Sequence, residues 1–86
     1  MVEWELVSWI LRGRLKRKII KSFDKPKTAT SLSKELKTHR STISSIIIEF
    51  EKKGILLCLD KGQPYNRFYK ITSFGEAVVK EIDNIR

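Results

Sequence analysis

The stretch LSKELKTHRSTISSII, residues 32–47, decides the fold that this sequence predicts. Leu32 and Leu36 are four residues apart, which is the spacing of side chains on one face of a helix. Thr30 is a residue type that often caps a helix start, so we expect a short helix over residues 31–37. Thr38 and His39 then interrupt the helical pattern and predict a turn.

A second helix is predicted over residues 40–53, directly after that turn. Its apolar residues recur at helical spacing and form one inward stripe, which consists of Ile43, Ile46, Ile47 and Phe50. Gly54 follows at a position where helices commonly end in the left-handed conformation. Residues 30–53 therefore have the pattern of a helix-turn-helix.

The chain beyond Gly54 predicts a β-hairpin and a final helix. Residues 55–59 and 67–72 are rich in branched and aromatic side chains, and the segment between them is full of turn-forming residues, so 55–72 is predicted as a hairpin. A last helix is expected over 73–85, capped by Thr72 or Ser73 together with Glu76. Its apolar stripe consists of Phe74, Val78, Ile82 and Ile85.

Before the helix-turn-helix, residues 1–22 predict one N-terminal helix, running from about residue 3. A core-facing stripe recurs along it, formed by Trp4, Val7, Leu11, Leu15 and Ile19. Its first ten residues are also apolar on the other faces, and a helix of that kind is buried on more than one side. We therefore expect a homodimer, with an interface formed by Leu6, Trp9 and Ile10 and by the last helix around Val79 and Ile82. A very short strand is compatible with residues 27–29.

The predicted order is three helices, a two-stranded hairpin and a C-terminal helix. This is the order of an α+β winged helix-turn-helix domain, in which the hairpin is the wing. With 86 residues, the chain has room for a single domain over 1–86.

The charge balance is strongly positive and indicates a polyanionic partner. Eighteen Lys and Arg residues stand against ten Asp and Glu residues, for a net charge of +8. Nucleic acid is the first partner that such a field predicts, and an anionic membrane surface is the second. A soluble basic protein without any polyanion role is the alternative.

The single cysteine, Cys58, cannot form an internal disulfide and is interpreted as a small buried apolar residue. No apolar run has the roughly 20 residues of a membrane span. The N-terminus carries acids before its apolar stretch, which is the reverse of a secretory signal. We therefore expect a cytoplasmic protein.

Three segments in order resemble the MarR-like and ArsR-like winged-helix transcription regulators. Residues 32–47 resemble the family's helix-turn-helix, residues 50–56 its passage from the recognition helix into the wing, and residues 69–75 its exit from the wing. The resemblance covers residues 28–79. Lys37 stands where the family often has Gly, Ser45 where many relatives have Arg, and Ile48 where many have a polar residue. The resemblance implies a regulator that binds double-stranded DNA.

The outward face of the 40–53 helix is predicted to read the major groove. Arg40 is the one long donor there, able to form a bidentate bond with guanine or to clamp a phosphate. The other predicted DNA contacts on or next to this helix are His39, Ser41, Thr42, Ser44 and Ser45. A capped and solvated helix start is the alternative interpretation of these hydroxyls.

Lys61 and Arg67 flank the predicted hairpin tip and are expected to contact the DNA backbone or minor groove. A merely solubilising hairpin end is the alternative. His39 has no Cys, His or paired carboxylate at ligand spacing, so no metal and no cofactor are predicted. No catalytic pattern supports an enzyme.

Two further functions remain open from the sequence. A winged-helix module can serve protein contact in a larger transcription or processing assembly, using Ile48, Trp9 and the apolar N-terminal helix. RNA binding is a weaker alternative, because no stacking aromatics are predicted on a sheet face.

Overall fold

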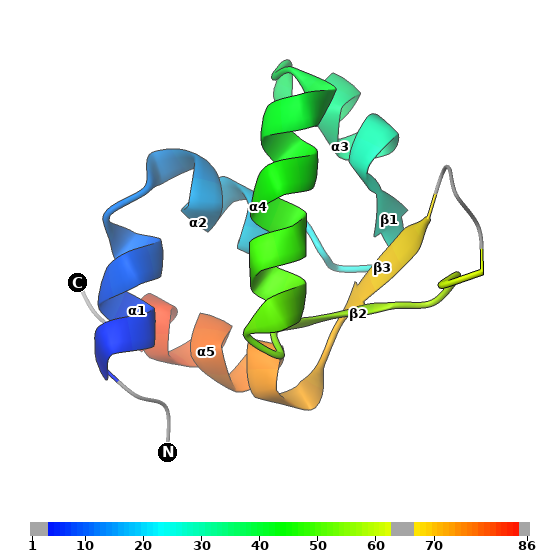
Figure 1. Ribbon diagram of the computed structural model, residues 1–86. Coiled ribbons are helices and arrows are strands. Elements are labelled where there is room, and N and C mark those ends of the chain that lie inside the picture. The colour runs from blue at the N-terminus through cyan, green and yellow to red at the C-terminus, as the bar shows by residue number, and fades with distance from the viewer. Residues whose placement is uncertain (1–3, 63–66, 85–86) are drawn as a thin grey trace.

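The computed structural model describes residues 4–62 and 67–84 of the chain. The described residues form an α+β fold with five helices and a small antiparallel sheet (Figure 1). In chain order these are α1 (Trp4–Leu11), α2 (Arg14–Lys21), β1 (Lys27–Thr28), α3 (Ala29–Leu36), α4 (Arg40–Lys52), β2 (Leu56–Cys58), β3 (Phe68–Ile71) and α5 (Ser73–Asn84).

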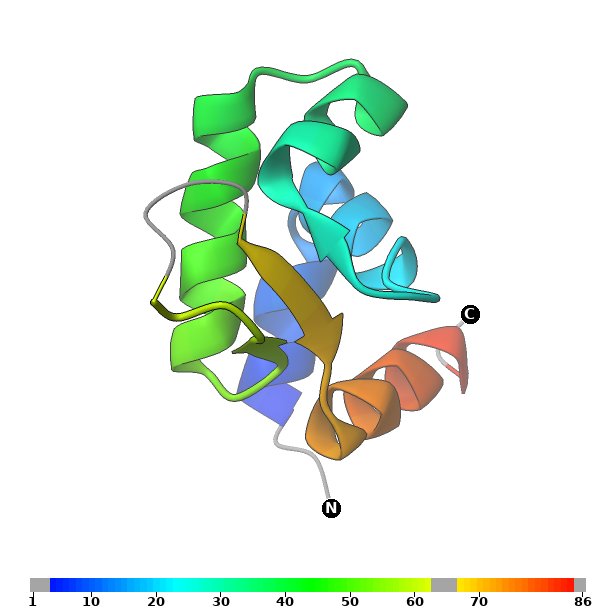
Figure 2. The ribbon, with the colours of Figure 1, turned by 90° about the vertical axis from the view of Figure 1, so that its right-hand side faces the viewer.

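The sheet has three strands in the order β1-β3-β2, all antiparallel. Cys58 pairs with Tyr69 across the predicted hairpin, and Thr28 pairs with Phe68 on the other side of β3. The short strand at residues 27–29 therefore forms, over two residues, and extends the hairpin into a sheet. Figure 2 shows the sheet lying in front of α1, α2 and α4, so the helices cover one of its faces.

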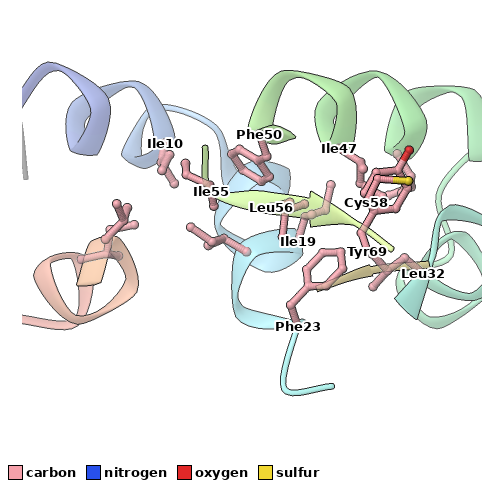
Figure 3. Packing of buried hydrophobic residues seen from close by; sticks show 14 of the residues in the cluster. Ile10, Ile19, Phe23, Leu32, Ile47, Phe50, Ile55, Leu56, Cys58 and Tyr69 are labelled. Carbon is pink, nitrogen blue, oxygen red and sulfur yellow. The ribbon is translucent and has the colours of Figure 1, made fainter. Parts of the chain in front are cut away.

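Helices and sheet share one hydrophobic core, which Figure 3 shows from close by. Phe50 and Ile47 reach it from α4, Ile10 from α1 and Ile19 from α2. Each fully buried side chain of this size contributes about 1.5–3 kcal/mol relative to an exposed one. Ile43, Ile47 and Phe50 confirm the predicted inward stripe of the second helix, while Ile46 is half-buried at its margin.

The predicted single helix over residues 3–22 is wrong, because the chain breaks at Arg12 and Gly13. Gly13 is extended (φ −114°, ψ 112°) and accepts from the N–H of Arg17 at 3.1 Å, so a new helix begins there. The guanidinium Nη1 of Arg17 also donates to the carbonyl of Leu11 at 2.6 Å and satisfies the end of α1.

This break changes which residues are buried. Ile10 and Ile82 lie in the core, 0% and 4% exposed, so they cannot line a dimer interface as predicted. Leu6, Trp9 and Val79, the other predicted interface residues, are half-buried against the core. Trp4 was expected to face the core and is instead 64% exposed.

α3 begins earlier than predicted, and its N-cap is Thr28 instead of Thr30. The hydroxyl Oγ1 of Thr28 accepts from the N–H of Ser31 at 3.0 Å. Next to it Lys27 is buried, and its Nζ contacts Glu35 Oε1 at 3.0 Å and Asp24 Oδ1 at 3.3 Å. These ion pairs tie β1 to α3 and to the connector before it.

The passage from α4 to the sheet agrees with the prediction. Gly54 has a left-handed backbone (φ 81°) just after the helix. Thr72 donates from its hydroxyl to the carbonyl of Gly54 at 2.7 Å and accepts from the N–H of Gly75 at 2.9 Å, so it caps α5 as expected. A methyl group on Gly75 would collide with the carbonyl oxygen of Ile55, so a glycine is needed for this close approach.

α5 differs from its predicted stripe at its first turn. Phe74 was expected inside and is 41% exposed, whereas Val78 is buried as predicted. Ile85 lies outside the described residues. Among residues 4–62 and 67–84, none of the helices is both long enough and apolar enough to cross a bilayer.

Candidate nucleic-acid interface

The site is built on α3 and α4, which the residues Lys37, Thr38 and His39 connect. Lys37 is left-handed (φ 53°, ψ 47°), and the N–H of Thr38 bonds to the carbonyl of Ser33 at 3.0 Å. This geometry closes the end of α3 in the manner of a helix that stops on a left-handed residue. The chain then turns sharply enough for α4 to pack against α3 (Figure 1).

α4 has one buried side and one exposed side along its 13 residues. Opposite its buried stripe, four exposed side chains follow one another at helical spacing, namely Ser41, Ser45, Ile48 and Lys52. This line is the part of α4 most remote from the core. The helix therefore has the outward face that the sequence predicts.

The residues predicted to contact DNA are exposed on the first two turns of α4, with one exception. Arg40, Ser41, Thr42 and Ser45 are exposed, and Ser44 is half-buried. His39 is exposed and occupies the N-cap, but its side chain makes no capping hydrogen bond. The first N–H groups of α4 are therefore not capped by that side chain, and they point toward whatever lies at the helix start.

Charge is distributed unevenly along α4. Its first turn holds no acid and begins with Arg40, and the positive end of the helix dipole lies there. Glu49 and Glu51 stand in the second half of the helix. A polyanion is therefore attracted more strongly to the first two turns than to the second half, where Lys52 only partly offsets the two acids.

Lys61 and Arg67 are both exposed. Lys61 follows β2 and Arg67 precedes β3, so both lie at the tip end of the hairpin. The N–H of Leu59 bonds to the carbonyl of Phe68 at 2.8 Å, and Asp60 Oδ2 accepts from the N–H of Phe68 at 3.0 Å. These bonds fix the base of the hairpin tip. The predicted tip residues Pro64 and Asn66 lie outside the described residues.

Figure 1 shows how the two parts of the site are arranged. The hairpin lies to one side of α4, and α1 and α2 lie to the other. The predicted residues thus form two groups, one on the first turns of α4 and one at the hairpin, instead of one continuous cluster.

Tyr69 belongs to β3, and its side chain is buried next to that of its strand partner Cys58. Burial raises the pKa of its hydroxyl, and Cys58 and Glu51 raise it further, whereas a hydrogen bond with Arg67 works in the opposite direction. Arg67 is therefore tied to the sheet through Tyr69. Among residues 4–62 and 67–84, no group of three His, Cys, Asp or Glu side chains is arranged to hold a metal ion.

Two exposed lysines that the sequence analysis left out belong to the same surface. Lys37 projects from the turn that precedes α4, and Lys52 continues the line of Ser41 and Ser45. The spacing of Lys52, eleven residues after Ser41, was a sufficient signal for its position. The sequence held one signal for Lys37: it stands at the position where the winged-helix regulators that the sequence resembles often have Gly.

Comparison of the sequence with models of known protein families finds no match, and none of the curated proteins compared with it matches either.

Proposed function

We propose that this chain is a winged-helix protein that binds double-stranded DNA, with the first turns of α4 in the major groove. The observation that carries the proposal is the first half of α4. Its outward side is exposed, begins with Arg40, and displays hydroxyls without any acid, on a chain of net charge +8. α3 supports this helix from behind, as in a helix-turn-helix.

The dimensions suit this role. A 13-residue helix is about 20 Å long, and the major groove is about 12 Å wide and admits one helix. Arg40 is positioned to bond guanine or a phosphate, while the hydroxyls of Ser41 and Ser45 donate to phosphates or to either kind of base. Glu49 and Glu51 weaken contact with phosphates beyond the first two turns.

The β2–β3 hairpin would act as the wing. Lys61 and Arg67 are its exposed cations. The hairpin lies to one side of α4 (Figure 1), where the backbone next to the bound groove would pass. Contacts of this kind position a protein on DNA without selecting its sequence. We therefore assign sequence preference to Arg40 and general affinity to Arg67.

Fluorescence anisotropy with a labelled duplex at several salt concentrations tests the proposal. We expect the logarithm of the affinity to fall linearly with the logarithm of the salt concentration. Arg40→Ala should reduce the difference in affinity between sequences by about 1–3 kcal/mol. Arg67→Ala should weaken binding to all sequences alike.

Arg14→Ala is the matched control for Arg40→Ala. Both arginines are exposed and begin a helix, so each variant removes the same charge at the same kind of position. Arg14 lies on α2 and is not one of the predicted DNA contacts. Absence of duplex binding at low salt, or equal effects of the Arg14 and Arg40 variants on discrimination, would refute the proposed interface.

A second function, protein contact, is favoured by a specific apolar surface. Leu57, Leu59 and Phe68 are exposed on the outer face of the hairpin, 45%, 47% and 46% respectively. Exposed apolar groups in one place commonly mark a contact surface. If the chain fails to bind duplexes, this face is the first place to search for its partner. Of the residues that the sequence predicted for protein contact, Ile48 is 43% exposed, whereas Trp9 packs on Phe50.

We also propose that two copies bind DNA together, because Arg40 alone supplies little discrimination. Of the residues that the sequence predicts for the interface, three remain partly accessible: Leu6, Trp9 and Val79. Sedimentation equilibrium should give twice the chain mass. A mass equal to that of one chain at every concentration would exclude a stable dimer.

A further inference from the structure

A hollow of about 680 Å³ opens beside α1, at the end of α4 opposite to the proposed DNA contact. Figure 1 shows α1 next to the C-terminal end of α4, with the start of α5 close by. Trp4, Glu5 and Trp9 line the hollow from α1, Arg12 from the residue that follows α1, Lys53 from the residue that follows α4, and Phe74 from the first turn of α5. Its volume lies in the range of small-molecule sites.

Aromatic side chains form the walls of this hollow. Trp4 is 64% exposed and Phe74 41%, although both are large apolar residues for which burial is favourable. Trp9 is half-buried, and its ring meets that of Phe50 in the core edge-on at 5.6 Å and 84°. Walls of this kind offer flat faces to a planar ring.

Cations gather around the same aromatic group. Lys53 Nζ lies 4.7 Å and Lys16 Nζ 4.1 Å from the centroid of the Trp9 ring, and Arg12 lines the hollow. In the part of the chain that the structure describes, no ion pair reaches any of these three side chains. Among the described residues that line the hollow, Glu5 is the one carboxylate against Arg12 and Lys53, so this part of the lining carries an excess of positive charge.

We propose that this hollow binds an aromatic phosphate monoester of the nucleoside monophosphate class. Trp4 and Phe74 stack on the planar ring, as aromatic side chains stack on bases. Arg12 and Lys53 bind the phosphate, which carries close to two negative charges at pH 7 and therefore suits two cations better than a carboxylate does. Glu5 is left to accept from a hydroxyl or amino group of the ligand.

Isothermal titration of the full chain with adenosine monophosphate tests this site. We expect one site per chain, with adenosine and inorganic phosphate each binding at least about tenfold more weakly, because each offers only half of the recognised chemistry. Equal affinity for inorganic phosphate and the nucleotide would overturn the proposal, because the aromatic walls would then contribute nothing. No heat of binding at millimolar nucleotide would also overturn it.

Matched variants separate this site from the general attraction of a basic protein for anions. Trp4→Ala and Arg12→Ala should each weaken nucleotide binding about tenfold or more. Phe68→Ala removes an exposed aromatic ring and Arg14→Ala an exposed arginine, both outside the hollow, and each should leave nucleotide binding unchanged. Equal losses in all four variants would overturn the site.

The outcome is independent of duplex binding. Arg40→Ala leaves the hollow intact, so it should retain full nucleotide affinity even where it changes DNA binding. Leu6 and Trp9, named above for the contact between two copies, also line the hollow, so a second copy of the chain is the competing occupant. If Trp4→Ala lowers the sedimented mass and nucleotides do not bind, the hollow is a contact between copies and the proposal is wrong.

Discussion

Lys37 is the residue on which the turn between α3 and α4 depends. Among the described residues it is the one non-glycine with a positive φ, 53°. A side chain in the left-handed region costs about 1–2 kcal/mol, because Cβ approaches the following carbonyl. The rest of the turn holds it there through the bond from the N–H of Thr38 to the carbonyl of Ser33.

Replacing Lys37 by glycine should therefore stabilise the protein. The relief of strain is partly offset by the greater freedom of glycine in the unfolded chain, which leaves a gain of about 0.5–1 kcal/mol. Urea denaturation followed by circular dichroism measures it. Lys34→Gly, in the helical part of α3, is the control and should cost about 1 kcal/mol. A loss of stability in both variants would show that the left-handed backbone of Lys37 is not strained.

Sequence patterns predicted the residues of α4 well and the caps of α3 less well. Ile43, Ile47 and Phe50 are large and recur at helical spacing, so their burial follows from periodicity alone. Thr28 and Thr30 are both good caps, and the choice between them depends on the pairing of Thr28 with Phe68 in the sheet. That contact joins residues forty positions apart, and local patterns carry no information about it.

At the scale of the element, the break between α1 and α2 explains why the N-terminal segment is apolar on several faces. A straight helix with such a pattern needs a second partner surface. Two short helices that change direction at Gly13 bring Ile10 and Ile20 into the same core instead. Gly13 was visible in the sequence, but one glycine within a long helical pattern is often tolerated, so the break could not be inferred from it.

Arg17 should be important for holding this break in place. Its guanidinium donates to the carbonyl of Leu11, where it also lies favourably at the negative end of α1. Arg17→Met keeps the aliphatic stem and removes the bond, so we expect a loss of about 1 kcal/mol in the free energy of unfolding. Arg14→Met, an exposed arginine on the same helix, should change little. Equal stability of the two variants would argue against this role of Arg17.

For the molecule as a whole, stability should decline at alkaline pH through two groups in or next to the sheet. Burial raises the pKa of the Tyr69 hydroxyl. Burial lowers the pKa of the Lys27 ammonium, but its bonds to Glu35 and Asp24 outweigh burial and leave the pKa raised. Both pKa values are higher in the folded than in the unfolded chain. Each group therefore stabilises the fold fully below its unfolded pKa, about 10, and this contribution is lost as the pH rises through the folded value.

The two groups can be separated by removing one of them. Tyr69→Phe eliminates the phenol that must ionise, while it keeps the ring beneath the hairpin and leaves Lys27 and every exposed lysine in place. Denaturation midpoints measured from pH 8 to pH 11 should fall less steeply for this variant than for the unmodified chain, although Tyr69→Phe starts lower by the loss of the bond to Arg67. Because the remaining lysines titrate in both proteins, their effect cancels in the difference between the two slopes. Parallel curves over this range would mean that the pKa of Tyr69 is the same in the folded and the unfolded chain, which would contradict the effect of its burial.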